Sequence, residues 1–377
     1  MGFSPRTAAR LAHCLLAAAL SLAAASAQAD PVQNLKDDLA RFKKNAQDDI
    51  ARMQHNIKNL QDDAARWREE INQDLQNWSD ELGRDVAVWQ IVAQRAQGNY
   101  LLPTAGTMSG EDFVQWQGLA RRYLYIRHNN AQPGAPVVII MHPHGLTPEK
   151  MGNLVRAGRL AASFGAVVLL PEAVNGAWNE DPSASQTADD VGFISALIDK
   201  AVVLYGINPK RVYATGYSSG GFMAARLGCE LSAKIAGVGE VAATMRGAMK
   251  QTCAPLHPMP ATIIAGTSDT VVPYNGIFEA LQSAPASAQM WAGLASCTGA
   301  TTTTRINPNG LDNTTVDLLR YRPCAGTNEV RLYTVNGGGH TWPGSPYGAY
   351  TMGLGRTSQD IDATLELWNF LSPYSAP

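Results

Sequence analysis

Residues 216–221 form the segment best suited to chemistry, a serine held between glycines. The sequence there is Gly-Tyr-Ser-Ser-Gly-Gly, which makes Ser218 the centre of a G-x-S-x-G pattern that occurs once. A stretch typical of a strand, 211–215, precedes the pattern, and we expect a helix directly after it. On such a tight turn the serine hydroxyl projects above the sheet, and Gly216 and Gly220 leave space where side chains would collide. The pattern in this setting predicts a nucleophilic serine.

A serine hydroxyl needs a base to take its proton, and an acid to orient that base. In folds with this turn the acid follows the serine along the chain and the histidine comes last. Asp269 lies in a loop at the end of the expected strand 261–266, and His340 follows three glycines. Such a glycine-rich loop can carry an imidazole over the serine. We therefore expect Ser218, Asp269 and His340 to form a catalytic triad.

Two backbone amides are expected to stabilise the negative oxygen of the reaction intermediate. The amide of Ser219 begins the helix after the nucleophile, and that of Leu146 lies in the loop after the strand 136–141. Trp178 and Trp342 are candidates for lining the acyl or alcohol pocket, with ordinary core packing as the alternative for each. This chemistry calls for no metal and no cofactor.

The elements that must position these residues alternate between strands and helices. We expect helices from the periodicity of residues 151–164, 189–205, 222–231 and 361–371, and buried strands at residues 136–141, 166–170, 211–215, 261–266 and 330–335. Strands that alternate with helices imply a parallel, doubly wound sheet. The predicted fold class is therefore α/β, with a doubly wound, mostly parallel sheet in a catalytic domain over residues 101–377.

Residues 1–29 are typical of a secretory signal peptide. Arg6 and Arg10 precede the apolar run 15–25, and Ala27-Gln28-Ala29 matches a cleavage site. The alternative is an uncleaved membrane anchor, but the run is shorter than the about 20 residues that span a bilayer. We expect cleavage near Ala29 and a secreted protein, extracellular or periplasmic.

Four cysteines follow the predicted cleavage site, and an even number in an exported chain favours two disulfides. The absence of a C-x-x-C pair disfavours a zinc site. Of the three pairings that four cysteines allow, we favour the one that joins nearest neighbours along the chain, Cys229 to Cys253 and Cys297 to Cys324.

Residues 30–100 differ from the rest of the chain. They carry dense mixed charge, and no Gly or Pro occurs from residue 32 to residue 82. Apolar positions recur every eleven residues, as Trp67, Trp78 and Trp89 illustrate, which predicts one long helical stripe. We expect a helical, coiled-coil-like arm that forms a homo-oligomer or packs on the catalytic domain. The alternative is adsorption to an insoluble apolar surface through the tryptophans.

Composition sets outer limits on these hypotheses. A chain of 377 residues, 45% of them hydrophobic, has room for one large core and an appendage. The formal net charge of −2 shows no excess of basic residues, so no nucleic-acid partner is expected.

Several blocks, in order along the chain, resemble one family. They are His144-Gly145, the runs at residues 190–193 and 208–213, the serine motif at 216–221, and the runs at 266–274 and 338–344. From residue 121 to its end the chain is similar to secreted esterases of the polyhydroxybutyrate depolymerase group, relatives of feruloyl and acetylxylan esterases. The resemblance implies the α/β-hydrolase fold, serine-esterase activity and both favoured cysteine pairings.

The chain departs from that family at three places. Leu146 stands where members usually carry a cysteine, and Glu180 ends the run Ala-Trp-Asn-Glu where they often carry Cys-Trp-Asn-Trp. The arm at residues 30–100 is outside the family pattern.

We therefore expect a secreted serine carboxylic-ester hydrolase, similar to polyhydroxybutyrate depolymerases, that works through an acyl-enzyme. Its expected partner is an ester substrate, either an insoluble polyester or an acylated polysaccharide. One alternative is a feruloyl or acetylxylan esterase acting on plant polysaccharide. Another, from a different class, is a non-catalytic protein that binds surfaces or oligomerises through its arm.

Overall fold

The computed structural model describes residues 100–183, 188–310, 312–346 and 353–377, together with Ala40, Lys43, Lys44 and Gln47. The predicted signal peptide lies outside the described residues. So does the predicted arm apart from those four positions, which are helical and exposed. Residues Leu101–Ser345 and Leu354–Pro377 form one compact unit.

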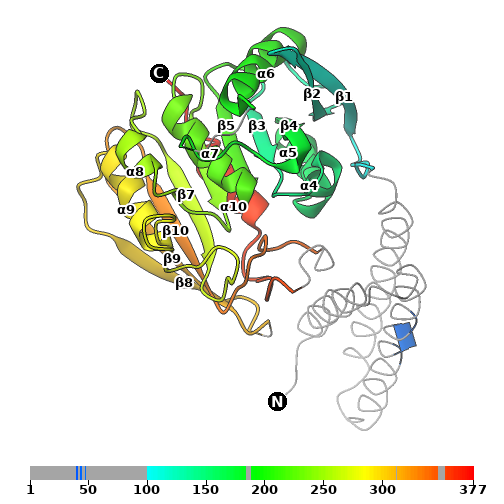
Figure 1. The fold of residues 1–377 in the computed structure, drawn as a ribbon. Coiled ribbons are helices and arrows are strands. Elements are labelled where there is room, and N and C mark those ends of the chain that lie inside the picture. Colours follow the sequence, from blue (N-terminus) through cyan, green and yellow to red (C-terminus); the bar gives the residue numbers. More distant parts are fainter. Residues whose placement is uncertain are drawn as a thin grey trace. The chain divides into compact units, whose positions relative to one another are not determined.

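One mixed sheet forms the centre of this unit (Figure 1). Its strands are β1 Thr107–Trp116, β2 Leu119–His128, β3 Val137–Met141, β4 Val167–Pro171, β5 Val212–Tyr217, β6 Gly237–Val241, β7 Ala261–Gly266, β8 Thr302–Ile306, β9 Thr315–Tyr321 and β10 Val330–Asn336. The ten strands lie in the order β1-β2-β4-β3-β5-β6-β7-β10-β9-β8. From β4 to β10 neighbouring strands are parallel, and the two strands at each edge pair antiparallel. The predicted mostly parallel α/β sheet is confirmed.

Helices cover both faces of the sheet. They are α4 Pro148–Leu154, α5 Gly158–Phe164, α6 Asp190–Tyr205, α7 Ser219–Glu230, α8 Met249–Thr252, α9 Ala284–Leu294 and α10 Ala363–Leu371, with a short 3₁₀ turn at Val174–Gly176. Val238 and Gly239 are adjacent in β6, so they face opposite sides of the sheet. A Cβ on Gly228 of α7 would lie 2.8 Å from Val238, and one on Gly239 would lie 2.3 Å from Leu367 of α10. The two helices therefore pack on opposite faces, which makes the sheet doubly wound.

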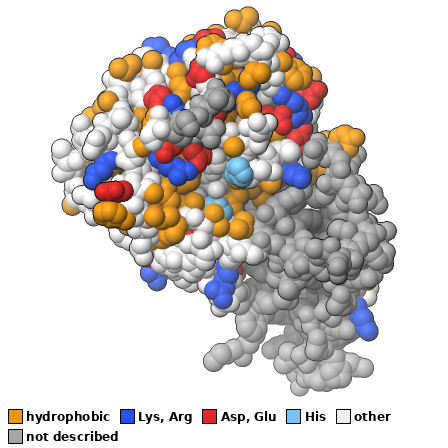
Figure 2. Space-filling model, in the orientation of Figure 1, with side chains coloured by type: hydrophobic (Ala, Val, Ile, Leu, Met, Phe, Trp, Pro, Cys, Tyr) orange, Lys and Arg blue, Asp and Glu red, His pale blue; other side chains and the backbone are white. Residues whose placement is uncertain are grey.

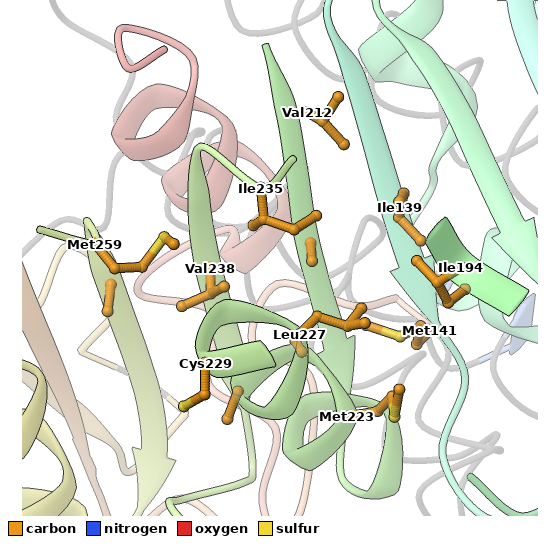
Figure 3. Close-up of a cluster of buried hydrophobic side chains, with 14 of the residues drawn as sticks. Ile139, Met141, Ile194, Val212, Met223, Leu227, Cys229, Ile235, Val238 and Met259 are labelled. Carbon is orange, nitrogen blue, oxygen red and sulfur yellow. The ribbon is translucent and has the colours of Figure 1, made fainter. Parts of the chain in front are cut away.

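The side chains labelled in the close-up of Figure 3 belong to the aliphatic and sulfur-containing part of a core cluster that also contains Tyr123, Phe193 and Trp291. Ile139 and Met141 from β3 meet Ile194 from α6 and Met223 and Leu227 from α7, and all five are fully buried. Because strands of a parallel sheet are covered on both faces, their sequences are continuous apolar runs instead of alternating ones. This is why β3, β4, β5, β7 and β10 were expected from the sequence.

The sequence pattern did not reveal β6. Its sequence, Gly-Val-Gly-Glu-Val, has two glycines and a carboxylate, which are rare in strand interiors. Leu371 and Leu367 of α10 lie close against the two glycines, so a side chain at either position would have to displace these leucines. This strand shows that packing against a helix can override local strand propensity.

Two disulfides link the loops of this unit. Cys229 at the end of α7 is bonded to Cys253 after α8, and Cys297 after α9 is bonded to Cys324 after β9. The predicted pairing is confirmed. The bonded residues are separated by 24 and 27 positions, and in the chain-entropy account each such bond stabilises the fold by on the order of 3 kcal/mol. In the described ranges no helix has the length and apolar character to cross a bilayer.

Glu240 of β6 is a carboxyl group buried in the core. Its side chain is fully buried, Oε1 accepts a 2.6 Å hydrogen bond from Nε1 of Trp291 in α9, and Oε2 has no partner among the described residues. Burial raises the pKa of Glu240 from its ordinary 4.5 to about 8, and the Trp291 hydrogen bond only partly opposes that rise. The folded protein thus keeps a proton on Glu240 over a pH range where the unfolded chain has released it.

A pH-dependent loss of stability follows from this proton. Between the unfolded and folded pKa values of Glu240, the free energy of unfolding falls as pH rises, because the native state binds more protons. Glu240→Gln keeps an acceptor for Trp291 and cannot ionise. We expect the wild-type Tm to fall more steeply than that of the variant between about pH 5 and about pH 8. Equal slopes in the two thermal melting series would contradict this account.

Candidate active site

Ser218 occupies the sharp turn between β5 and α7. Its backbone has φ 54° and ψ −120°, a strained conformation for a residue with a side chain. Hydrogen bonds on both sides hold it: its N–H donates to the Val241 carbonyl at 2.9 Å, and its own carbonyl accepts from Gly221 N at 2.8 Å and Phe222 N at 3.0 Å. Ser218 is partly exposed. The projection of its hydroxyl above the sheet stays a prediction.

Close backbone contacts explain the flanking glycines. A Cβ on Gly216 would lie 2.2 Å from the backbone of Gly220, and one on Gly220 would lie 2.2 Å from the carbonyl oxygen of Met141. Distances this short exclude any side chain, and the atoms in the way are backbone atoms that cannot turn aside. The turn therefore requires glycine at both positions.

Asp269 and His340 meet at one end of the sheet. Asp269 follows β7 and His340 follows β10. These strands are parallel neighbours, so both loops begin at the carboxyl-terminal end of the strands. Nδ1 of His340 lies 2.7 Å from Oδ2 of Asp269, and the imidazole and the carboxylate are both buried. The other carboxylate oxygen accepts from Val271 N and Val272 N at 2.8 Å each. Asp269 is thus oriented to fix Nδ1 of His340 as a donor and leave Nε2 to act as a base.

Tyr217 ties the serine turn to the histidine loop. Its hydroxyl donates a 2.5 Å hydrogen bond to the backbone carbonyl of His340, and the two rings lie 5.2 Å apart. Burial, with a smaller contribution from the charge of Asp269, raises the pKa of Tyr217, so the phenol stays protonated as a donor. Sequence analysis did not identify Tyr217. Its position directly before the serine was the only available signal.

The structure brings together two members of the predicted triad and places the third nearby in the fold. Within the part of the chain that the structure describes, the Ser218 hydroxyl makes no hydrogen bond. Contacts between nucleophile and base often tighten only when substrate binds. The contact between the Ser218 hydroxyl and Nε2 of His340 stays a prediction.

The two expected oxyanion donors differ in their surroundings. Ser219 is the first residue of α7, so its N–H belongs to the first turn, which has no acceptor within the helix and favours negative charge. The N–H of Leu146 donates to the carbonyl of Pro143 at 3.2 Å in a tight turn. Leu146 would have to share or leave that bond to serve as a donor, and its role stays a prediction.

A buried histidine, His142, supports the loop that carries Leu146. Its Nδ1 lies 2.8 Å from the carbonyl of Pro143, and its Nε2 accepts from Ala173 N at 3.1 Å. Burial lowers the pKa of His142, which matches a neutral ring with the proton on Nδ1. The backbone carbonyl of His142 accepts a 2.9 Å hydrogen bond from Nε1 of Trp178. Sequence analysis assigned His142 no role.

Both tryptophans proposed to line a pocket are buried. Trp178 is 2% exposed and Trp342 is 1% exposed, and Nε1 of Trp342 donates to Thr364 Oγ1 at 3.1 Å. Together with the bond from Trp178 to His142, these contacts support core packing. Substrate contact by either residue stays a prediction.

Figure 2 shows histidine side chains on one face of the molecule, near acidic and basic side chains. No group of three or more His, Cys, Asp or Glu side chains in the described ranges is placed to hold a metal ion. What the described arrangement offers is an oriented imidazole, a serine on a strained turn and a helix N-terminus.

Comparison with known proteins finds esterases. Feruloyl esterase B of Piromyces equi is 31% identical over 220 residues, which are 55% of this chain and 39% of that protein. A bifunctional acetylxylan esterase/xylanase of Neocallimastix patriciarum is 25% identical over 70% of this chain and 35% of its own. A poly(3-hydroxybutyrate) depolymerase of Ralstonia pickettii is 30% identical over 34% of this chain and 30% of its own. The resemblance predicted from the motifs is confirmed.

In these three alignments the chain spans well under half the length of each relative. No protein-family model matches the sequence. Among solved structures, an acetyl xylan esterase from Aspergillus awamori aligns with a TM-score of 0.46 and 17% identity, over 62% of this chain and 94% of that one.

The close approach at the serine turn generates a prediction for Gly220→Ala. The added methyl would displace the turn, and a misplacement of about 1 Å costs on the order of a hundredfold in rate. We expect at least that loss in hydrolysis of a short p-nitrophenyl ester. Gly293→Ala in α9 is the matched control, because a Cβ there meets nothing within 4 Å. Wild-type rates for Gly220→Ala would contradict the role of the turn.

Proposed function

We propose that this chain is a secreted serine carboxylic-ester hydrolase with the α/β-hydrolase fold. The observation that carries the proposal is the buried pair of Asp269 and His340, which lies at the edge of the sheet where parallel strands end. The serine turn of Ser218, also at the end of a parallel strand, supplies the nucleophile. The esterase relatives support the same chemistry.

The proposed reaction begins with proton transfer from the Ser218 hydroxyl to Nε2 of His340. The serine oxygen bonds to the ester carbonyl carbon, and the amides of Ser219 and Leu146 stabilise the oxyanion that results. The carbon–oxygen bond to the alcohol then breaks, and the leaving oxygen takes the proton from His340. Water, deprotonated by His340, then attacks the acyl carbon. The bond from this carbon to the Ser218 oxygen breaks, that oxygen takes the proton back from His340, and the acid is released. Asp269 stabilises the imidazolium in both halves of the reaction.

For the substrate we propose a polyester of the polyhydroxybutyrate type. The second candidate is a feruloyl or acetyl ester on plant polysaccharide, favoured because feruloyl esterase B aligns over 220 residues. Export is proposed from the signal-like residues 1–29, and the two disulfides are consistent with it. We further propose that residues 101–377 are the catalytic domain and that residues 30–100 form an arm able to oligomerise the chain or adsorb to a surface.

Substitution of the nucleophile gives the direct test. Ser218→Ala should lower kcat on a p-nitrophenyl ester by at least about a thousandfold and abolish labelling by a fluorophosphonate probe. A panel of polyhydroxybutyrate film, methyl ferulate and acetylated xylan then distinguishes the substrate classes. Undiminished hydrolysis by Ser218→Ala would refute the assignment, whereas a wild-type protein inert to probe and panel would favour a non-catalytic role.

Asp269→Asn tests the orientation of the base. The amide can hold His340 in the wrong tautomer, and in the best-studied triad this change lowers kcat on the order of ten-thousandfold. We expect a loss of at least about a hundredfold here, with the fold intact by circular dichroism. A variant that retains full kcat would assign the acid to another residue.

A further inference from the structure

A partly buried ion pair lies against the first turn of α7. The Ser219 hydroxyl donates to Oε2 of Glu180, and Oε1 of Glu180 pairs with Nη2 of Arg246. The Glu180 side chain is 14% exposed and that of Arg246 is 26% exposed. The Ser219 hydroxyl is separated from its own amide nitrogen only by Cα and Cβ. A carboxylate therefore lies close to the amide proposed to stabilise the oxyanion.

The arginine is fixed in place from two sides. Its guanidinium stacks over the ring of Phe222, 4.4 Å from the ring centroid, and its backbone forms a β-bridge with Leu281. Phe222 lies three residues after Ser219, on the same side of the first turns of α7. Both members of the ion pair are thus anchored to the helix that follows the nucleophile.

Such a carboxylate poses an electrostatic problem. Negative charge develops beside the Ser219 amide when the serine oxygen adds to the ester, and an unpaired Glu180 would repel it. An unpaired Glu180 would also leave a net negative charge at the site, which would move the acid limb of the pH profile upward. The positive charge of Arg246 offsets both effects, because the ion pair has no net charge and its electric field falls off steeply with distance.

We propose that Arg246 is a positioning residue that neutralises Glu180, so that the carboxylate can hold Ser219 without opposing the oxyanion. The proposal rests on the proposed function. Glu180 occupies a position where members of the resembled family often carry tryptophan, so this charge compensation would be a feature of this chain.

Among the described residues, other charged groups also contact or face this ion pair and His340. Arg226 donates to the carbonyl of Asn179 at 2.7 Å and pairs with Glu230 at 2.8 Å. Asp181 interacts electrostatically with both arginines. On the histidine side, Asp269 is the charged group in contact with His340.

The test compares Arg246→Met, Glu180→Gln and the double variant by kcat, KM and the pH profile of kcat/KM. Arg246→Met leaves the carboxylate unpaired, so we expect kcat to fall about tenfold or more and the acid limb to move up by several tenths of a pH unit. Glu180→Gln leaves Arg246 unpaired and moves the acid limb down. The double variant is neutral, and its kcat and acid limb should return to near wild type.

Arg305→Met is the matched control, because it removes an arginine from the exposed pair with Asp317 between the edge strands β8 and β9. It should change neither kcat nor the profile. Arg246→Lys keeps the charge and should keep the wild-type acid limb. If Arg246→Met does not fold, Glu180→Gln tests the proposal by itself. This variant keeps an acceptor for the Ser219 hydroxyl, and its acid limb should move to lower pH.

A purely structural role predicts a different pattern. The double variant would then be at least as impaired as the worse single variant, and no acid limb would move. Either result overturns the proposal, as would a shift in Arg246→Lys equal to that in Arg246→Met. Failure of the proposed function is distinguishable, because wild-type protein and Ser218→Ala would then hydrolyse the ester equally.

Discussion

The strained backbone of Ser218 is the constraint on which the rest of the site depends. A residue with a side chain adopts φ 54° only where surrounding contacts leave no alternative. Here β3 supplies the carbonyl of Met141 against Gly220, and β6 supplies the carbonyl of Val241 to Ser218 N. The serine turn is therefore held by three neighbouring strands together, β3, β5 and β6.

The parallel sheet also brings the proposed base, His340, and its proposed acid, Asp269, together. Because β7 and β10 are neighbours and run the same way, residues 71 positions apart in the chain meet across a 2.7 Å hydrogen bond. Tyr217 then links this pair to the serine turn by bonding the carbonyl of His340. The serine turn and the His340 loop are thus connected by this hydrogen bond, so a shift of one would displace the other.

Charge around the site is balanced locally. Asp269 is matched by backbone donors and by His340, and Glu180 is matched by Arg246. Buried carboxylates are costly unless they are paired or hydrogen-bonded. Glu240 lacks such a partner for one oxygen and keeps its proton instead, through the rise in its pKa to about 8. Two responses to buried charge, pairing and neutralisation, thus occur within one domain.

The sequence by itself determined most of the central strands and the choice of Ser218, Asp269 and His340 as the residues proposed for catalysis. Continuous apolar runs predict buried parallel strands, and glycines beside Ser218 and before His340 predict turns, because both signals are local. The tertiary structure alone decided that Gly-Val-Gly-Glu-Val is a strand, that Trp178 and Trp342 are buried, and that Tyr217, Glu180 and Arg246 surround the serine turn. These features depend on contacts between residues distant in the chain, which no local pattern records.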